Sequence, residues 1–237
     1  MQDKRKRINN IISDAFPRIL IVIVLYICTK TKILKIPTTY KTLKNTSEGR
    51  YKEKGSKFIG IAIPCETEED AKEYLAKWRN DHHQACHVCY AYRFGINKDV
   101  YRANDDGEPS NSAGPPILGQ IQSFDLTNEL IGVVRYYGGT NLGVGGLINA
   151  YRTAAKEAIE NGKVIQETVK DRFQLYFNYS DMALLMDAVK ESKAVISKQI
   201  FENDCYLKIA IPINHTANLI TKLESFDSLK IEKIGTF

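Results

Sequence analysis

Several well-known catalytic signatures are missing from this sequence of 237 residues. It holds neither the Gly-Lys-Ser/Thr triplet of a Walker loop nor the GxGxxG pattern of dinucleotide-binding proteins. The GxSxG turn of serine hydrolases and the HExxH pair of zinc proteases do not occur either. These absences exclude nucleotide binding by either of the two known loops and hydrolysis through the two catalytic motifs.

Cysteine is too scarce and too scattered for a disulfide framework. The five cysteines are Cys28, Cys65, Cys86, Cys89 and Cys205. An odd number without regular spacing is unlike a secreted, disulfide-bonded protein, so we expect a reducing, cytoplasmic setting. Cys86 and Cys89 lie close to three histidines, but the second half of a zinc site is missing and a strand would turn the two thiols to opposite faces. We expect no metal and no cofactor.

A strong charge of one sign is lacking from most of the chain. The net charge is +5, but the first 36 residues hold eight basic and two acidic residues and contribute +6. Residues 37–237 therefore sum to −1, and their bulk charge does not favour tight, nonspecific binding of nucleic acid. A local basic patch stays open as an alternative.

Long hydrophobic runs are also lacking. The longest, Ile19–Cys28, has ten residues, whereas a membrane-spanning helix needs about 20. Lys4–Arg7 precede it as in a signal peptide, but no small-x-small cleavage site follows. We therefore expect residues 1–36 to be a leader or extension outside the fold, and no membrane contact for residues 37–237. Anchoring through Ile19–Cys28 is the alternative.

The apolar pattern after this leader mixes short strands with helices. Thr67, followed by three acidic residues, predicts a helix start, because its hydroxyl can accept from a free amide. A helical turn is expected over Ile117–Gln122, and a helix over Leu147–Glu160, ended by Asn161-Gly162. The expected strands are Gly55–Ile63, Ala85–Phe94, Val100–Arg102 and Leu130–Arg135.

The last segment has its own order of elements, which is β-α-β-β-α-β and is typical of a ferredoxin-like domain. An Asp181 cap is expected for its first helix, and a turn is expected at Asn203-Asp204. Its nine basic and nine acidic residues cancel. We predict an α+β protein with domains at 37–168 and 169–237. The elements expected in the second domain are Arg172–Tyr179, Ala183–Ser192, Ala194–Glu202, Cys205–Ile213, His215–Phe226 and Leu229–Ile234.

Three carboxylates stand close together in a loop, at Asp105, Asp106 and Glu108. One interpretation is a divalent-metal site or an acid/base pair, although an EF-hand register fails. The other is a turn around Gly107 whose side chains satisfy loop amides or Arg135.

Five glycines between Gly138 and Gly146 separate an apolar strand from a helix start. Glycine allows positive φ and close backbone approach, and a helix start presents free N–H groups. With Arg135 beside it, this loop is expected to dock an anion or a partner's backbone; a purely structural loop is the alternative. We expect Gly139→Val and Gly145→Val to damage it, since a β-branched residue tolerates positive φ poorly.

The aromatic residues near these motifs also allow two interpretations. Tyr90, Tyr92, Phe94, Tyr136 and Tyr137 have Arg93 and Arg135 among them and could stack on bases. The alternative is that they are core residues of strands.

Taken together, three blocks resemble the IMPACT/YigZ family, over roughly residues 40–179. They are His83-x-x-x-His87-x-Cys89-Tyr90-Ala91-Tyr92-Arg93, Asp106-Gly107-Glu108-Pro109 with Ser112-Ala113-Gly114, and Val134-Arg135-Tyr136-Tyr137-Gly138-Gly139 with Leu142-Gly143 and Gly145-Gly146-Leu147. The resemblance implies an N-terminal β-α fold like domain IV of the translocation elongation factor and a tail like its domain V. Residues 1–36 lie outside the family pattern.

The resemblance also implies a role in translation, since the eukaryotic relative competes for an activator of a stress-responsive initiation-factor kinase. The leading hypothesis is a non-enzymatic regulator that binds a ribosome or a translation-related protein or RNA, without DNA specificity. The rival is an enzyme acting on a phosphorylated or peptide substrate, with a metal on Asp106 and Glu108 and the substrate on Arg135. The expected binding residues are Arg135, Tyr136, Gly138, Gly139, Thr140, Gly143, Gly145, Gly146, Asp106, Glu108, Ser112 and His83.

Overall fold

The computed structural model describes residues 37–201, 205–224, 226 and 228–236. The leader expected at residues 1–36 and the turn expected at Asn203-Asp204 lie outside these ranges. Every helix within them falls short of the length and apolarity that crossing a bilayer requires.

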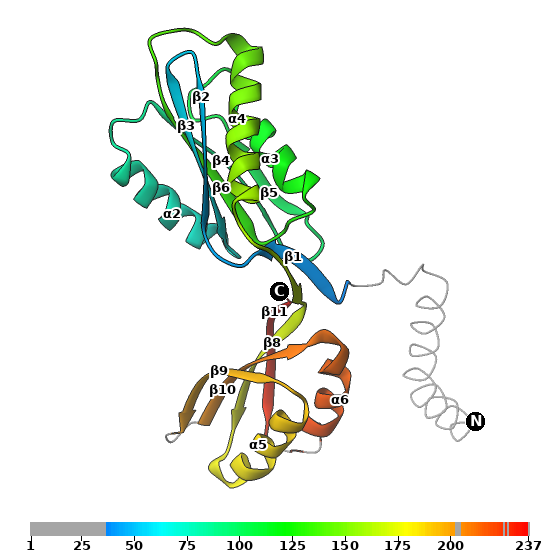
Figure 1. Ribbon diagram of the computed structural model, residues 1–237. Helices are drawn as coiled ribbons and strands as arrows, with labels where there is room; N and C mark the ends of the chain where they lie inside the picture. The colour runs from blue at the N-terminus through cyan, green and yellow to red at the C-terminus, as the bar shows by residue number, and fades with distance from the viewer. Residues whose placement is uncertain (1–36, 202–204, 225, 227, 237) are drawn as a thin grey trace, which may run out of the picture. The chain divides into compact units, whose positions relative to one another are not determined.

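The first domain is built on a five-stranded antiparallel sheet with the strand order β2-β3-β6-β4-β5 (Figure 1). The central strand β6 is almost wholly buried, which explains its unbroken apolar run. A separate antiparallel pair joins β1 to β7. The strands are β1 (Thr39–Leu43), β2 (Ser47–Glu53), β3 (Ser56–Pro64), β4 (His87–Phe94), β5 (Val100–Asn104), β6 (Glu129–Tyr136) and β7 (Val164–Thr168).

Helices cover both faces of this sheet (Figure 1). Helix α2 (Glu68–Asp81) buries Leu75 and Trp78 in the core on one face, and α3 (Gly114–Ser123) and α4 (Gly143–Glu160) build the core on the other. The sheet carries glycine where the helices come closest. A Cβ on Gly60 would lie 2.3 Å from the Ala154 carbonyl oxygen, and one on Gly132 would lie 2.4 Å from the Trp78 ring.

The helix starts show where local sequence signals were sufficient to predict the first residue of a helix. Thr67 caps α2 as expected, accepting from the Asp70 amide at 3.1 Å. Helix α3 is a full helix rather than the expected turn, because Pro115 and Pro116 preset its first turn. Helix α4 starts at Gly143, earlier than the expected Leu147. Strands β1, β2 and β7 were not predicted, since their residues are largely polar.

The second domain has the expected β-α-β-β-α-β order, so its ferredoxin-like fold is confirmed. Its antiparallel sheet has the order β11-β8-β10-β9, with α5 and α6 packed on one face. The Asp181 cap was a wrong prediction: its carboxylate makes no cap bond and accepts from Ser228 instead. The elements are β8 (Lys170–Phe177), η1 (Tyr179–Asp181), α5 (Met182–Glu191), β9 (Val195–Phe201), β10 (Cys205–Pro212), α6 (Ile213–Leu223) and β11 (Lys230–Thr236).

Candidate functional site

The first carboxylate of the acidic loop organises the loop itself. Asp105 lies between β5 and α3, and its two carboxylate oxygens accept hydrogen bonds from the amides of Asn111, Ala113 and Gly114 at 2.8, 2.9 and 2.8 Å. Two of these amides stand at the start of α3, where backbone N–H groups lack helical partners. Asp105 therefore caps α3 from outside the helix, a role that its place in the sequence did not reveal.

Asp106 links the loop to two neighbouring elements. Its carboxylate accepts from the Val88 amide on β4 and from the Arg79 guanidinium on α2, both at 2.7 Å. The backbone turns here through positive φ at Asp106 (45°) and Gly107 (85°). Gly107 adopts that conformation without strain, and the two hydrogen bonds to the Asp106 carboxylate hold Asp106 in it.

Glu108 is the centre of a buried polar cluster, the Glu108 cluster, formed with Arg135, Tyr151 and His87. Only 8% of Glu108 and 6% of Arg135 are exposed. The Glu108 Oε1 atom accepts from the Arg135 guanidinium and from the Tyr151 hydroxyl, each at 2.6 Å. Arg135 lies on β6, just before the glycine loop, and Tyr151 lies on α4, just after it. One carboxylate oxygen therefore joins the strand and the helix that flank the loop.

The third neighbour of Glu108 is held by its own backbone contact. The Nδ1 atom of His87 lies 2.7 Å from the Asp106 carbonyl oxygen, which can only accept, so Nδ1 carries the proton. Its Nε2 atom points toward the Glu108 Oε1 atom at 3.9 Å. A protonated His87 would add a second positive charge beside this carboxylate.

Burial sets the charge state of the remaining polar side chains. It raises the pKa of the Tyr151 hydroxyl far above its usual value, and Cys89 and Glu108 nearby raise it further. Burial likewise raises the pKa of the Cys89 thiol, which donates to the Asp105 carbonyl oxygen at 3.0 Å. Both groups stay neutral donors at physiological pH, so neither is poised as a nucleophile.

Arg135 makes further contacts besides its ion pair with Glu108. Its guanidinium lies 5.5 Å from the ring centroids of both Phe58 and Tyr137, which is a cation–π distance. Its Nε atom is buried and has no hydrogen-bond partner among the described residues. In this structure Arg135 is an internal residue, not an exposed side chain beside the loop.

The glycine loop, residues 138–146, is exposed over most of its length. Gly138 packs against the β2–β3 turn, where an added Cβ would lie 2.0 Å from the Gly55 carbonyl carbon. At Gly139, Gly143 and Gly145 an added Cβ would meet nothing within 4 Å. Helix α4 also starts without a side-chain cap, so no side chain covers its first free amides.

The backbone meets the positive-φ requirement at Gly139 but not at Gly145. Gly139 has a φ of 84°, as the prediction for Gly139→Val requires. Gly145 lies in the first turn of α4 and is not among the positive-φ residues, so the positive φ from which the effect of Gly145→Val was predicted is absent. A single sequence shows that glycines cluster but does not show which of them need positive φ.

The expected binding residues fall into separate groups. Glu108 and Arg135 meet in the interior, and Asp106 is half-buried beside Arg79. Gly139, Thr140, Gly143 and Gly145 are exposed. Tyr136 bonds through its hydroxyl to the His82 Nδ1 atom at 2.8 Å. Two residues lie apart: His83 is exposed after α2, and Ser112 is fully buried, donating to the Pro109 carbonyl oxygen at 2.6 Å.

The strand aromatics divide in the same way. Tyr92 and Phe94 are buried and stacked at 4.4 Å, so they are core residues. Tyr137 is exposed. Tyr151 was missed as a cluster member, and the one signal for it was a polar aromatic on an otherwise alanine-rich helix face.

The cluster favours one of the two interpretations of the acidic loop. Each of the three carboxylates already accepts hydrogen bonds from amides, arginines or a tyrosine of the chain. Within the described ranges, no three histidine, cysteine or acidic side chains are grouped closely enough to hold a metal ion. The observed contacts are those of the turn in which acidic side chains satisfy loop amides and Arg135.

A sheet with helices on both faces, followed by a ferredoxin-like domain, defines a two-domain α+β protein. The Impact N-terminal domain family matches residues 54–159, which include the acidic loop and the glycine loop. The chain is 32% identical to IMPACT family member YvyE of Bacillus subtilis over 160 residues, which is 68% of this chain and 74% of that protein. It therefore belongs to the IMPACT family.

Further comparisons agree with this assignment. An IMPACT family member of Haemophilus influenzae is 34% identical over 163 residues, 67% of this chain and 78% of that protein. IMPACT family member YigZ of Escherichia coli is 29% identical over 175 residues, 73% of this chain and 86% of that protein. The crystal structure of a hypothetical protein matches with a TM-score of 0.67 and 26% identity, covering 84% of this chain and 98% of that chain.

Proposed function

We propose that this protein is a non-enzymatic, translation-associated regulator that binds its partner, a ribosome or a translation-related protein or RNA, through the glycine loop. One observation carries the proposal: Glu108 bonds to both Arg135 and Tyr151, on either side of the loop. This arrangement holds the exposed loop in one geometry before any partner arrives, and preorganisation lowers the entropy cost of binding.

The roles of the individual residues follow from their positions. The free amides at the start of α4 meet an anionic group or the backbone of the partner. Arg135 and Glu108 act indirectly, by fixing the strand and the helix that flank the loop. Asp106 steadies the acidic loop beside them. Membership of the IMPACT family supports a role in translation, because the eukaryotic relative regulates that process.

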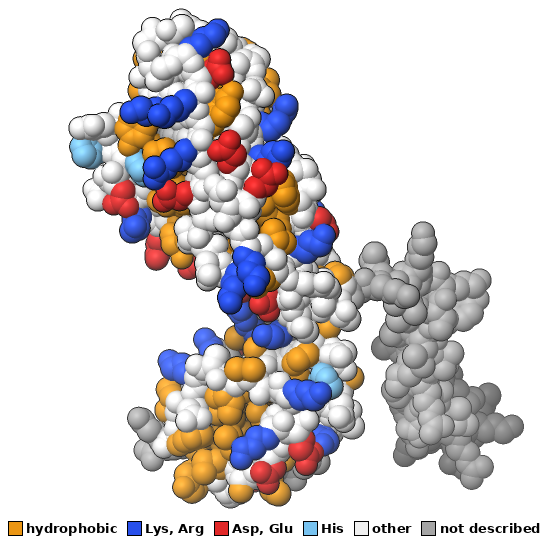
Figure 2. All heavy atoms as spheres, viewed as in Figure 1, with side chains coloured by type: hydrophobic (Ala, Val, Ile, Leu, Met, Phe, Trp, Pro, Cys, Tyr) orange, Lys and Arg blue, Asp and Glu red, His pale blue; other side chains and the backbone are white. Residues whose placement is uncertain are grey.

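Charge supports contact at a small site rather than over a broad surface. Figure 2 shows basic and acidic side chains interspersed over the visible face of the N-terminal domain. The body of the chain has a net charge close to zero. A partner recognised at a single loop therefore fits better than one held by a large positive field.

Sucrose-gradient co-sedimentation of the full chain with ribosomes, at low and moderate salt, tests this proposal. The informative variant is Gly145→Asp, because the site has room for the side chain and an acid in the first turn suits the helix dipole. Its carboxylate would occupy the place of the partner's anion, so comigration should be lost. The matched control Gly145→Asn keeps the size and removes the charge, so it should comigrate better than Gly145→Asp.

Two results would count against the proposal. Wild type that stays at the top of the gradient at both salt concentrations would contradict direct ribosome binding and move a protein partner or an enzymatic role ahead. Comigration of Gly145→Asp equal to wild type would remove the glycine loop from the contact.

A further inference from the structure

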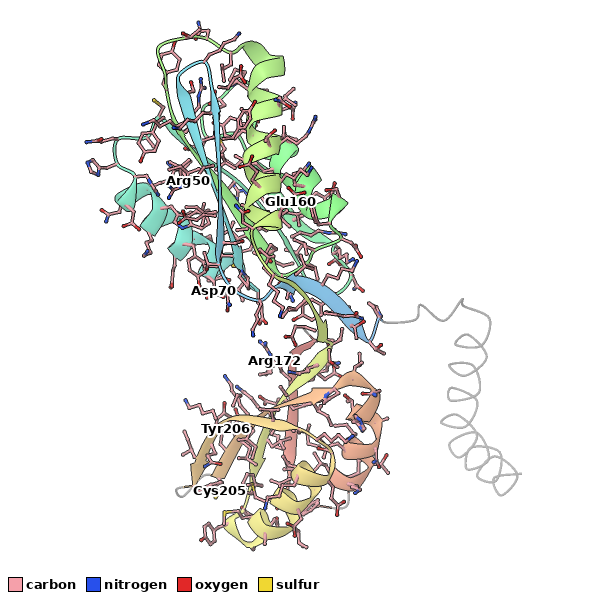
Figure 3. The ribbon with its side chains drawn as sticks, in the orientation of Figure 1. Arg50, Asp70, Glu160, Arg172, Cys205 and Tyr206 are labelled. Atoms are coloured by element: carbon pink, nitrogen blue, oxygen red, sulfur yellow. The ribbon has the colours of Figure 1, made fainter. Side chains whose placement is uncertain are left out.

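The sheet of the C-terminal domain has one face that its helices leave open. Residues of β8 and β10 alternate strictly between buried and half-buried. Cys205 and Tyr206, both labelled in Figure 3, follow each other on β10 and so point to opposite faces. Cys205 belongs to the core under α5 and α6, which places Tyr206 on the open face. We call this surface the open face; its central residues are Gln174, Tyr176, Lys198, Ile200, Tyr206, Lys208, Lys230 and Glu232.

Two tyrosines occupy the middle of the open face. Tyr176 on β8 and Tyr206 on β10 stand directly opposite each other in the register, with ring centroids 5.3 Å apart. The Tyr176 hydroxyl donates to the Gln174 side-chain oxygen, and the Gln174 amide donates to the Tyr206 hydroxyl, each at 3.2 Å. Both hydroxyls are thus drawn toward Gln174, a neighbour on the same face. The two ring planes are tilted by 43° to each other.

Basic residues surround this aromatic pair. Lys230 lies 5.6 Å from the Tyr176 ring centroid, and Lys198 stands directly opposite Lys208 in the register. The acidic residue of this group, Glu232, pairs with Lys230 at 2.6 Å. Arg172, farther along β8, pairs with Glu66 at 2.7 Å. The domain as a whole is neutral, yet the centre of its open face carries three lysines against one glutamate.

The pairing of Lys198 with Lys208 is itself informative. Like charges directly opposite each other on a sheet are destabilising. Neither lysine forms an ion pair with another side chain in the described part of the chain, so nothing there offsets the repulsion. A phosphate bound between Lys198 and Lys208 would offset this repulsion. The two tyrosine rings beside them would then receive the bases attached to that phosphate.

We infer that the open face binds single-stranded RNA, with bases stacked on Tyr176 and Tyr206 and phosphates contacting Lys198, Lys208 and Lys230. Aromatic residues on the central strands of a four-stranded β-α-β-β-α-β sheet are a general means of stacking unpaired bases. Paired bases hide their faces inside a duplex, so this arrangement selects single strands. The choice of RNA over DNA rests on the proposed function in translation.

Fluorescence anisotropy of the full chain with a labelled oligouridine of about 12 nucleotides tests the inference. Tyr206→Leu should weaken binding by about 10-fold or more, because stacking on one ring is lost. Tyr206→Phe keeps the ring and should stay within about 3-fold of wild type. Tyr179→Leu is the matched control, since Tyr179 is exposed on η1, outside the four-stranded sheet, and its loss should leave affinity unchanged.

The contribution of the lysine charges to RNA binding is measured separately, from the dependence of the affinity on salt concentration. Lys198→Ala combined with Lys208→Ala should reduce the slope of log affinity against log salt by about 1, since each phosphate contact releases counterions. Lys190→Ala on α5, on the opposite side of the sheet, should not change the slope. Equal affinity for a duplex of the same length, or displacement of the RNA by polyglutamate but not by unlabelled RNA, would overturn the inference. A matched oligodeoxyuridine that binds better than the oligouridine would overturn the choice of RNA.

This experiment separates the inference from the proposed function of the glycine loop. RNA affinity of Tyr206→Leu equal to wild type, with an unchanged circular dichroism spectrum, overturns the open-face site whatever the ribosome gradients show. RNA binding lost in Tyr206→Leu but retained in Gly145→Asp supports the open-face site even if the loop proves to have no role.

Discussion

The two sheets of this protein differ in how much of them is covered. The five-stranded sheet carries helices on both faces, while the four-stranded sheet carries them on one (Figure 1). Polar residues near the first sheet, such as Glu108 and Arg135, are therefore drawn inside and bonded to each other. Polar and aromatic residues on the open side of the second sheet, such as Tyr206, keep contact with solvent. Polar side chains thus hold elements together inside the first domain, while polar and aromatic side chains form part of the solvent-facing surface of the second.

The largest effect in this comparison should come from the covered domain. Glu108→Ala leaves the Arg135 charge buried without a partner and the Tyr151 hydroxyl without its acceptor. We expect the free energy of unfolding to fall by about 3 to 5 kcal/mol, measured by urea denaturation. Glu69→Ala, which removes an exposed ion pair with Lys72 at 3.9 Å, should cost less than about 0.5 kcal/mol.

A double variant sharpens this prediction. Glu108→Leu combined with Arg135→Met replaces both charges with apolar side chains. It should recover much of the stability that Glu108→Ala loses, because no unpaired charge stays buried. A loss in the double variant as large as in Glu108→Ala would show that shape, not the buried charge, dominates.

A second buried carboxyl in this domain should make stability depend on pH. Glu129 is fully buried, and burial raises its pKa to about 8, compared with about 4.3 in an unfolded chain. Between these values the folded state keeps a proton that the unfolded chain has released. The contribution to stability is therefore complete below the lower value and is lost as pH rises toward the higher one. We expect the free energy of unfolding to fall by on the order of 3 kcal/mol between about pH 5 and pH 8.

Urea titrations across that range check the pH dependence. Glu129→Gln removes the titrating group and should flatten the curve. The hydrogen bonds that Glu129 accepts from the Thr42 hydroxyl and the Leu43 amide, both at 3.2 Å, can be accepted by the glutamine oxygen as well. A slope that is unchanged in this variant would assign the pH dependence to another group.

Close packing between layers predicts opposite effects for the same substitution at two glycines. Gly60→Ala should cost about 2 kcal/mol, since the new Cβ would collide with the Ala154 carbonyl oxygen of α4 at 2.3 Å. Gly119→Ala lies within α3, where an added Cβ meets nothing within 4 Å. That variant should gain about 0.5 to 1 kcal/mol from helix propensity. Thermal unfolding of both variants checks the signs, and equal signs would refute the packing argument.

These contacts also explain how far the sequence alone could lead. Elements with a strong period, such as α2 and the β-α-β-β-α-β tail, were predictable because local burial dictates their pattern. Strand β2 was not, because its polar residues find their partners through pairing with β3 and contacts with α4, which lie far away in the sequence. The assignment of residues 1–36, 37–168 and 169–237 to separate units stays a prediction.

The candidate site shows the same limit. Arg135 could be recognised as important from its place before the glycine loop, and the acidic loop could be recognised from its composition. That Glu108 would reach both Arg135 and Tyr151 depends on contacts between residues 27 and 43 positions apart, which no local pattern encodes. The positive φ at Gly139 but not at Gly145 depends likewise on where α4 begins.

The smallest expected effect completes the comparison between the two sheets. Tyr92 on β4 is buried and stacked on Phe94, so Tyr92→Leu should cost about 2 kcal/mol. Tyr206 on β10 lies on the open face, so Tyr206→Leu should cost less than about 1 kcal/mol. Urea denaturation of the two variants under one set of conditions compares these two losses in the free energy of unfolding. If Tyr206→Leu destabilises as much as Tyr92→Leu, Tyr206 is a packing residue, and the open face is less free to bind than its residues indicate.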